Sequence, residues 1–249
     1  MSKVPLIVED KNLSNAWRRI LELLVNNRGE ISPLVLTLTD FHETKSIKDV
    51  LVKHLEVKKM PAIETVSETI FPESLYEYVG YDREKLYARY KKNLIRLKKI
   101  NKANRKGTYF SRLIAYGEVL NPINQLEIVI SALKGKRSPR RSKLQASVFD
   151  PTTDHSNSAM QGFPCLQHVT FFKTKEGGLV LNSFYAIQFF YKRSYGNWLG
   201  LINLGKFVAK ETGLKFERFN CFIGVEQLDH LKQSEAKKLL ILMDSAVTT

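Results

Sequence analysis

The chain has 249 residues, of which 43% are hydrophobic and 26% charged, so it can bury a sizeable core. It contains no run of about 18 apolar residues, so we expect no membrane span. The N-terminus lacks a signal-peptide core, which favours a cytoplasmic protein. Cys165 and Cys221 are the only cysteines and lie far apart in sequence, so neither a disulfide scaffold nor a cysteine metal site is indicated. The five histidines show no ligand spacing.

The net charge of +14 favours a polyanionic partner such as a nucleotide or a nucleic acid. The alternative is a solvated basic surface without a partner. The charge therefore limits the class of ligand but identifies neither the fold nor the chemistry.

The first predicted elements alternate between helix and strand. Residues 12–27 have apolar side chains at helical spacing and predict an amphipathic helix with Ser14 or Asn15 as its cap. Residues 33–40 alternate as in a strand, and residues 46–57 predict a short helix.

Residues 58–80 mix proline, threonine and aromatic residues and give no assignment. The next segment, residues 81–106, is the most basic part of the chain. From residue 82 onward its leucines and tyrosines recur at helical spacing, with lysine and arginine on the remaining faces. Residues 82–106 are thus either a solvated surface helix or a phosphate-binding helix.

The central part of the chain combines a helix, a basic loop and a strand. Residues 121–134 predict a helix with Asn121 as N-cap and Pro122 at its first position. Residues 134–143 form an exposed basic loop, the second candidate for contact with nucleic acid, and residues 144–149 predict a strand.

The last third of the chain is rich in strands. Residues 168–174 and 179–190 predict a hairpin joined at a glycine pair, and a helix over 198–213 comes next. Residues 216–225 predict another strand, and residues 231–243 are helical or partly extended. The order of elements predicts an α+β fold in layers with a large mixed or antiparallel sheet.

Short motifs between residues 107 and 229 occur in the order and spacing of one enzyme family. In that order they resemble the thymidylate synthase and deoxycytidylate hydroxymethylase family. The resemblance implies one layered α+β domain over residues 1–249, with a large mixed sheet packed by helices, and a homodimer. The motifs are Asn124-Gln125-Leu126, Arg140-Arg141, Val148-Phe149-Asp150-Pro151, Pro164-Cys165, Phe171-Phe172, Gly177-Gly178, Asn197 and Gly213-Leu214.

By resemblance, the chain is a divergent C5 methyl- or hydroxymethyltransferase for a pyrimidine nucleotide. Its one-carbon donor would be 5,10-methylenetetrahydrofolate, and no metal is implied. Cys165 would be the nucleophile, and Asn197 would read the base edge, where an amide suits a uracil-type base. Arg140 and Arg141 would lower the pKa of the thiol and clamp phosphate across the dimer, and Arg28 would also reach the phosphate.

Other interpretations of these residues stay open. Cys165 is otherwise a small buried residue, and Asn197 is otherwise the N-cap of the 198–213 helix. Several family positions are altered, so the alternative is a non-catalytic relative that binds nucleotide, nucleic acid or a protein through its basic surfaces. The family's phosphate and ribose positions fall on Ala186, Ile187, Gln227 and Asp229, Arg193-Ser194 has a different spacing, and none of Glu73, Glu77 and Glu118 fits the supporting glutamate.

Overall fold

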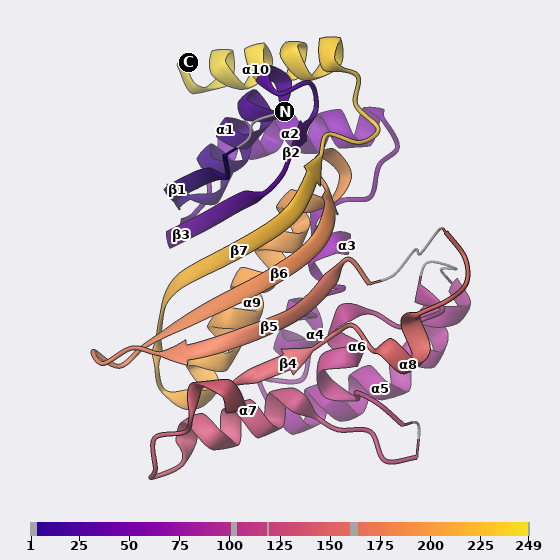
Figure 1. Cartoon of the computed structure of the whole chain (residues 1–249), viewed down its shortest axis with the longest axis vertical. Helices are drawn as coiled ribbons and strands as arrows, with labels where there is room; N and C mark the ends of the chain where they lie inside the picture. The colour runs from indigo at the N-terminus through magenta and orange to yellow at the C-terminus, as the bar shows by residue number, and fades with distance from the viewer. Residues whose placement is uncertain (1–3, 101–103, 119, 160–163, 249) are drawn as a thin grey trace.

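A computed structural model of the chain describes residues 4–100, 104–118, 120–159 and 164–248. It shows a layered α+β architecture around a seven-stranded mixed sheet of order β1-β3-β7-β6-β5-β4, with β2 paired to β7 (Figure 1). The predicted fold class is confirmed. The strands are β1 (Leu6–Asn12), β2 (Glu30–Ile31), β3 (Leu34–His42), β4 (Gln145–Ser147), β5 (Leu166–Lys173), β6 (Gly178–Phe189) and β7 (Lys215–Gln227).

The helices fall into an N- and C-terminal group beside β1 and a larger group that lies behind and below the sheet in Figure 1. A 3-10 turn at Arg141–Lys143 and a π-helical turn at Phe190–Ser194 connect elements. The helices are α1 (Leu13–Asn26), α2 (Lys45–Val57), α3 (Ile63–Ser67), α4 (Glu73–Tyr78), α5 (Arg83–Ile100), α6 (Tyr109–Ile114), α7 (Gln125–Lys134), α8 (Pro151–Asp154), α9 (Tyr195–Thr212) and α10 (Gln233–Thr248).

Two glycine positions explain the turns that the sequence predicts. Gly177 has φ of +89° at the tip of the β5–β6 hairpin, a conformation that glycine adopts without strain. Gly213 ends α9 with φ of +69°, in the left-handed conformation typical of helix C-termini. The predicted hairpin and the predicted helix end are confirmed.

Several predicted boundaries are wrong because a neighbouring residue supplies the cap. Asn12 caps α1 by accepting a hydrogen bond from the backbone N–H of Asn15, while Ser14 is buried inside the helix. Asn124 caps α7, so the helix begins after Asn121 rather than at it. The unassigned residues 58–80 contain α3 and α4, and the ambiguous C-terminal segment is helix α10.

Close packing of α9 on α3 positions the residues of the site. A Cβ atom at Gly196 would lie 2.6 Å from the Cβ of Val66, and one at Gly200 would lie 2.7 Å from the carbonyl oxygen of Ser67. Any larger side chain would push the two helices apart. The glycines therefore bring the segment after α3 against the first turns of α9.

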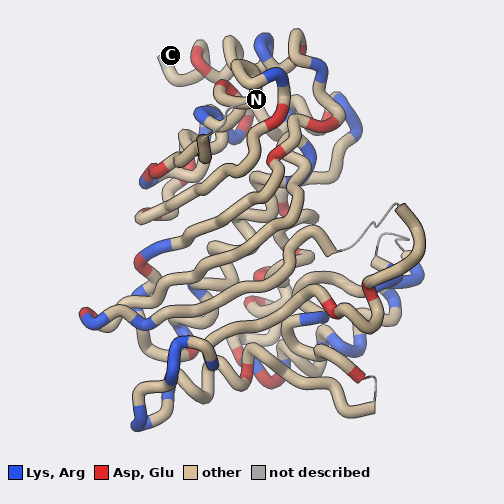
Figure 2. Tube along the Cα trace, in the orientation of Figure 1, with Lys and Arg blue, Asp and Glu red and all other residues tan. Residues whose placement is uncertain are grey.

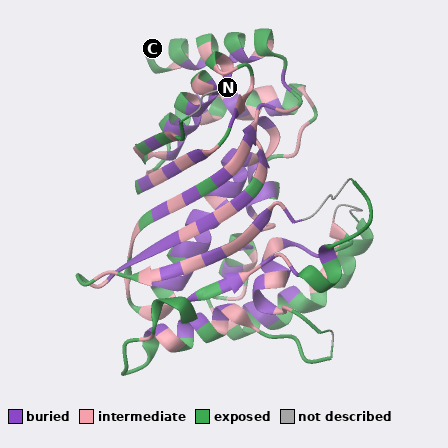
Figure 3. Cartoon of the chain, viewed as in Figure 1, coloured by how far each residue is buried: buried purple, intermediate pink, exposed green. Residues whose placement is uncertain are grey.

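One face of the sheet is not covered by any helix in the described part of the chain (Figure 1). Buried and less buried residues alternate along its strands (Figure 3). Side-chain hydrogen bonds cross this face as a ladder from Thr37 through Asn220 and Asn182 to Thr170. Beside it, Phe184 stacks on Phe222, whose side chain is 41% exposed.

Within the described ranges, no helix is both long and apolar enough to cross a membrane.

Candidate functional site

A cavity of about 200 Å³ lies where the start of β5, the end of β6 and the first turn of α9 meet the segment between α3 and α6. Cys165 and Asn197, both predicted from the sequence, line it together. Arg193, Gln188 and Tyr109 also line it. The cavity thus combines a thiol, two amides, a guanidinium and a phenol.

Cys165 is half-buried and is held by its backbone. Its carbonyl oxygen accepts a hydrogen bond from the N–H of Ala186 at 3.1 Å, and the amide of Gln167 donates to the carbonyl of Pro164 at 2.8 Å. Burial raises the pKa of the Cys165 thiol, while the charges of Arg193 and Lys192 act in the opposite direction. In the single ligand-free chain, burial outweighs the nearby cations, so the expected lowering of this pKa by Arg140 and Arg141 of a second subunit stays a prediction.

Asn197 lies in the first turn of α9 and is only 4% exposed. The prediction that it caps the helix is wrong, because the chain is already helical at Ser194, after the π-helical turn. No hydrogen bond to its side chain is found among the described residues, so its amide can serve a ligand.

Arg193 reaches the cavity through the π-helical turn Phe190–Ser194. The family's spacing before Asn197 does not identify Arg193 as the phosphate-binding arginine, because that family position falls on Ala186. The wider turn places Arg193 beside Cys165 instead. Ser194 is buried away from the cavity, where it accepts a hydrogen bond from Trp17 at 2.9 Å.

The positions aligned with the family's ribose-binding pair are engaged within this chain. Asp229 pairs with Lys192 at 2.9 Å, and Gln227 donates a hydrogen bond to Glu30 at 3.0 Å. Lys192 also lies 4.5 Å above the ring of Phe189. Lys192 lines the cavity, so the Lys192–Asp229 pair forms part of its rim.

Tyr109 is a site residue that sequence reasoning missed. Hydrogen bonds from the backbone of Cys165 and Leu166 reach its hydroxyl, and burial holds the pKa of this phenol above its ordinary range. The capping box formed by Thr108 and Ser111 fixes the helix start at Tyr109. That capping pattern, directly after Gly107, was the available signal in the sequence.

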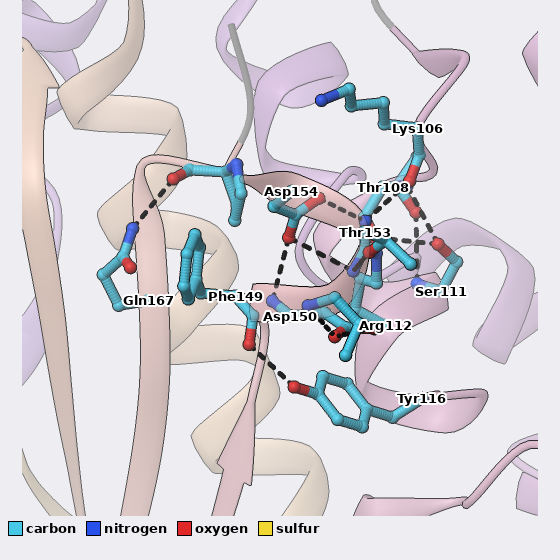
Figure 4. A network of polar contacts seen from close by, with 12 residues as sticks. Lys106, Thr108, Ser111, Arg112, Tyr116, Phe149, Asp150, Thr153, Asp154 and Gln167 are labelled. Atoms are coloured by element: carbon cyan, nitrogen blue, oxygen red, sulfur yellow. Dashed lines mark hydrogen bonds and ion pairs between the residues drawn. The ribbon is translucent and has the colours of Figure 1, made fainter. Parts of the chain in front are cut away.

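A buried polar network supports this wall of the cavity (Figure 4). Arg112 on α6 pairs with Asp154 on α8 at 2.8 Å, and the side chain of Asp154 is fully buried. Asp154 also accepts a hydrogen bond from the backbone N–H of Asp150 at 2.9 Å, and Arg112 donates to the carbonyl oxygen of Lys106 at 3.3 Å. The network joins α6, α8 and the segment before Thr108, so it fixes the cavity wall.

A second cavity, of about 560 Å³, shares Thr69, Asn104 and Thr108 with the first. Glu68 lines it, and burial raises the pKa of this carboxyl group. The candidates for the supporting glutamate, Glu73, Glu77 and Glu118, line neither cavity. Glu68 is therefore the carboxyl that the fold brings next to the site, and the sequence did not single it out.

The three arginines predicted for the phosphate lie outside the Cys165 cavity. Arg140 is exposed, and the guanidinium of Arg141 lies 4.3 Å above the ring of Phe172. Arg28 is exposed in the turn after α1, where the neighbouring Gly29 accepts a hydrogen bond from Leu228 at 2.8 Å. Within one chain the charges that act on the thiol are those of Arg193 and Lys192, and the predicted action of Arg140 and Arg141 across a dimer stays a prediction.

The basic segments are largely exposed. Lysine and arginine gather on the loop after α7 (Figure 2), within residues 134–143. On α5, Leu86, Tyr87 and Tyr90 are buried, while the basic residues remain at the surface. Lys102 of the predicted segment 82–106 lies outside the described residues. Where the chain is described, no three His, Cys, Asp or Glu side chains gather as metal ligands.

Comparison with known proteins finds a distant relative, and no family model matches the chain. The chain is 24% identical over 216 residues to a protein of Methanocaldococcus jannaschii named "Putative thymidylate synthase", and the match covers 85% of each chain. It therefore supports a distant thymidylate-synthase-like relation over most of the chain.

Proposed function

We propose that this chain is a divergent thymidylate-synthase-like C5 methyl- or hydroxymethyltransferase for a pyrimidine nucleotide, folded as one domain over residues 1–249. The observation that carries the proposal is the single cavity that gathers Cys165, Asn197 and Arg193. These side chains supply a nucleophile, a base-reading amide and a cation for phosphate.

The chemistry derives from these three groups. The thiol of Cys165 gives up its proton to solvent, and the thiolate sulfur forms a bond to C6 of the pyrimidine ring. The C5–C6 electron pair then moves toward O4, where an N–H of Asn197 stabilises the developing charge. An anionic nucleotide would pair with Arg193, and Lys192 is already paired with Asp229, so a further cation must favour the thiolate in the bound state.

The second cavity supports the assignment of a one-carbon donor. Its size lies within the range of about 300–1,000 Å³ that is typical of small-molecule sites. Pro72, Leu75 and Tyr90 give it an apolar wall, and Glu68 gives it a carboxyl group. These residues fit a flat, partly polar group such as the ring of 5,10-methylenetetrahydrofolate, which would supply the carbon. Glu68 would hold a proton beside it.

A homodimer would explain the remote arginines. The uncovered sheet face carries Phe222 and the ladder of hydrogen-bonded polar side chains, and both suit contact with a second copy. Arg141 lies over Phe172, a residue of β5 in this sheet. We propose that Arg140 and Arg141 of one subunit reach the phosphate in the site of the other.

Covalent trapping tests the proposal. The protein is mixed with 5-fluoro-dUMP and methylenetetrahydrofolate, and intact mass is measured. We expect an adduct that Cys165→Ala abolishes. Cys221→Ala is the matched control, because Cys221 is fully buried and lines neither cavity, and this variant should keep the adduct. Absence of an adduct with fluorinated uridine and cytidine nucleotides would contradict the enzyme proposal.

A second candidate function has its own support. The raised pKa of Cys165 and the exposed basic loop 134–143 favour a non-catalytic relative that binds nucleic acid. Its test is the affinity for single- and double-stranded RNA and DNA across salt concentrations. A logarithmic slope near zero would contradict this candidate, whereas loss of slope in a variant with loop lysines and arginines replaced by glutamine would support it.

A further inference from the structure

Two buried polar side chains behind the Cys165 cavity have no partner in the protein. Gln188 on β6 is 1% exposed and lines the cavity, and Glu226 on β7 is fully buried. Neither the two amide atoms of Gln188 nor the two carboxyl oxygens of Glu226 make a hydrogen bond. The two residues are register partners on adjacent parallel strands, so their side chains start next to each other.

Both side chains are buried at positions where the sheet face is otherwise open. Strict alternation places Gln188 on the open face with Phe184, and Glu226 on that face with Phe222, yet both are buried. Gly224 lies two residues before Glu226, and a Cβ atom there would lie 2.7 Å from the carbonyl oxygen of Ala186. The glycine therefore permits a close approach of β6 and β7 next to the two polar side chains.

The two amide atoms of Gln188 and the two carboxyl oxygens of Glu226 are buried without a hydrogen-bond partner, which calls for an explanation. Buried amides and carboxyl groups in folded proteins are nearly always hydrogen-bonded, and orphan atoms are costly. Apolar residues of similar size would be cheaper here. Because Gln188 lines the cavity, a ligand can satisfy it, and this makes the pair a candidate for recognition rather than for stability.

The chemistry of Glu226 sets the direction of the contact. Burial raises the pKa of Glu226 well above its ordinary value, which favours a protonated carboxyl group with an O–H to donate. Gln188 is its register partner, and a rotamer change would let the amide carbonyl oxygen accept that O–H. The amide nitrogen of Gln188 would then be left to donate an N–H to a ligand in the cavity.

We propose that Gln188 and Glu226, which make no hydrogen bond in the ligand-free protein, form an amide–acid pair when a ligand binds and then recognise a ring carbonyl of the substrate base. Gln188 is the contacting group and Glu226 is the positioning residue behind it. The pair would select a base with a carbonyl oxygen at C4, as in uracil, over one with an amino group at C4, as in cytosine, and would share this edge of the base with Asn197. The inference rests on the proposed function, since it takes the ligand to be a pyrimidine nucleotide.

The test compares the affinities for dUMP and dCMP by calorimetry, with intact protein. For the wild type we expect at least about tenfold tighter binding of dUMP. Gln188→Met should remove most of that preference. Glu226→Gln should bring the ratio of the dUMP and dCMP affinities to within about threefold of unity. The new amide can either donate to or accept from Gln188, so Gln188 can present either a donor or an acceptor to the base. Ser183→Ala is the matched control on β6, as Ser183 is buried but outside the cavity, and it should leave the ratio unchanged.

Two readouts separate misfolding from lost recognition. Affinity for inorganic phosphate should stay within about twofold in all variants. Removing orphan polar atoms should raise the melting temperature of Gln188→Met by a few degrees. Lower dUMP affinity together with unchanged phosphate binding and equal or higher melting temperature would support the pair as a recognition device.

The outcomes also separate this inference from the proposed function. In one outcome, the wild type binds dUMP and forms the covalent adduct while all variants keep the wild-type preference for dUMP over dCMP. That result would overturn the recognition role of Gln188 and Glu226, and the transferase proposal would stand. A wild-type preference for dCMP would overturn the pair as well. If the wild type binds neither nucleotide and forms no adduct, the proposed function fails, and the inference fails with it.

Discussion

Two groups of buried polar side chains near the Cys165 cavity differ in whether their hydrogen-bonding groups have partners. In the Arg112–Asp154 network each charged group has a partner within the chain (Figure 4). Gln188, which lines the cavity, and its register partner Glu226 have none. The first arrangement stabilises the fold, and the second leaves hydrogen-bonding capacity for something outside the chain.

The difference teaches how to separate structural from functional polar groups without a bound ligand. A satisfied network loses stability when one member is removed, because the remaining charge is left buried alone. An unsatisfied cluster gains stability when a member is replaced by an apolar residue, and the loss falls on binding. Substitutions in each cluster test that distinction.

The largest expected effect is in the satisfied network. Asp154→Ala should lower the free energy of unfolding by about 3–5 kcal/mol, because it leaves Arg112 buried without its counter-charge. Chemical denaturation measures this. Asp244→Ala is the control. It removes an ion-pair partner of Arg18 that is far more exposed than Asp154, and it should lower the free energy of unfolding by less than about 1 kcal/mol. Equal losses in the two variants would contradict the comparison.

The next effect has the opposite sign. Glu226→Met should raise the free energy of unfolding by about 1–3 kcal/mol at neutral pH, since it removes an orphan carboxyl group. The raised pKa of Glu226 means that the folded state holds a proton that the unfolded state releases, so wild-type stability falls as pH rises from about 4.3 through the raised pKa. Denaturation at several pH values should show that the free energy of unfolding falls less steeply with rising pH in the variant. The share of this pH dependence that comes from the raised pKa of Glu68 should remain. Destabilisation at every pH would show that Glu226 has a partner after all.

A smaller effect should appear in the chemistry of the thiol. Arg193→Met should raise the pKa of Cys165 further, because it removes the largest opposing charge. Alkylation by iodoacetamide at pH 8, in a Cys221→Ala background, should slow by about three- to tenfold. An unchanged alkylation rate would show that the charge of Arg193 does not act on the Cys165 thiol.

The smallest effect concerns the distant arginine. Arg141→Ala should cost about 0.5–1 kcal/mol of stability through loss of its contact with Phe172. In the monomer it should leave the alkylation rate of Cys165 unchanged. Sedimentation would establish the oligomeric state, and a slower rate confined to the dimer would place Arg141 at the partner's site.

Periodicity predicted most of the regular elements, because the hydrophobic pattern of α1, β3 and the β5–β6 hairpin is local. Strand β1 was not predicted, since its short apolar stretch is followed directly by Glu9 and Asp10 and its place depends on parallel pairing with β3. The caps were shifted because Asn12 and Asn124 compete with nearby polar residues of equal propensity.

The site could be predicted only in part. Motif order led to Cys165 and Asn197, and the fold brings both into one cavity. Arg193 was excluded by spacing, because a π-helical turn cannot be read from residue types. Gln188 and Glu226 carry no local signal at all, since their importance arises from burial and register across two strands.

The turn Phe190–Ser194 has a consequence for how such chains evolve. A π-helical turn accommodates one inserted residue within a helix and rotates the chain before it by about 100° relative to the helix after it. An ancestral insertion there would preserve the sheet and α9 while exchanging which side chains face the cavity.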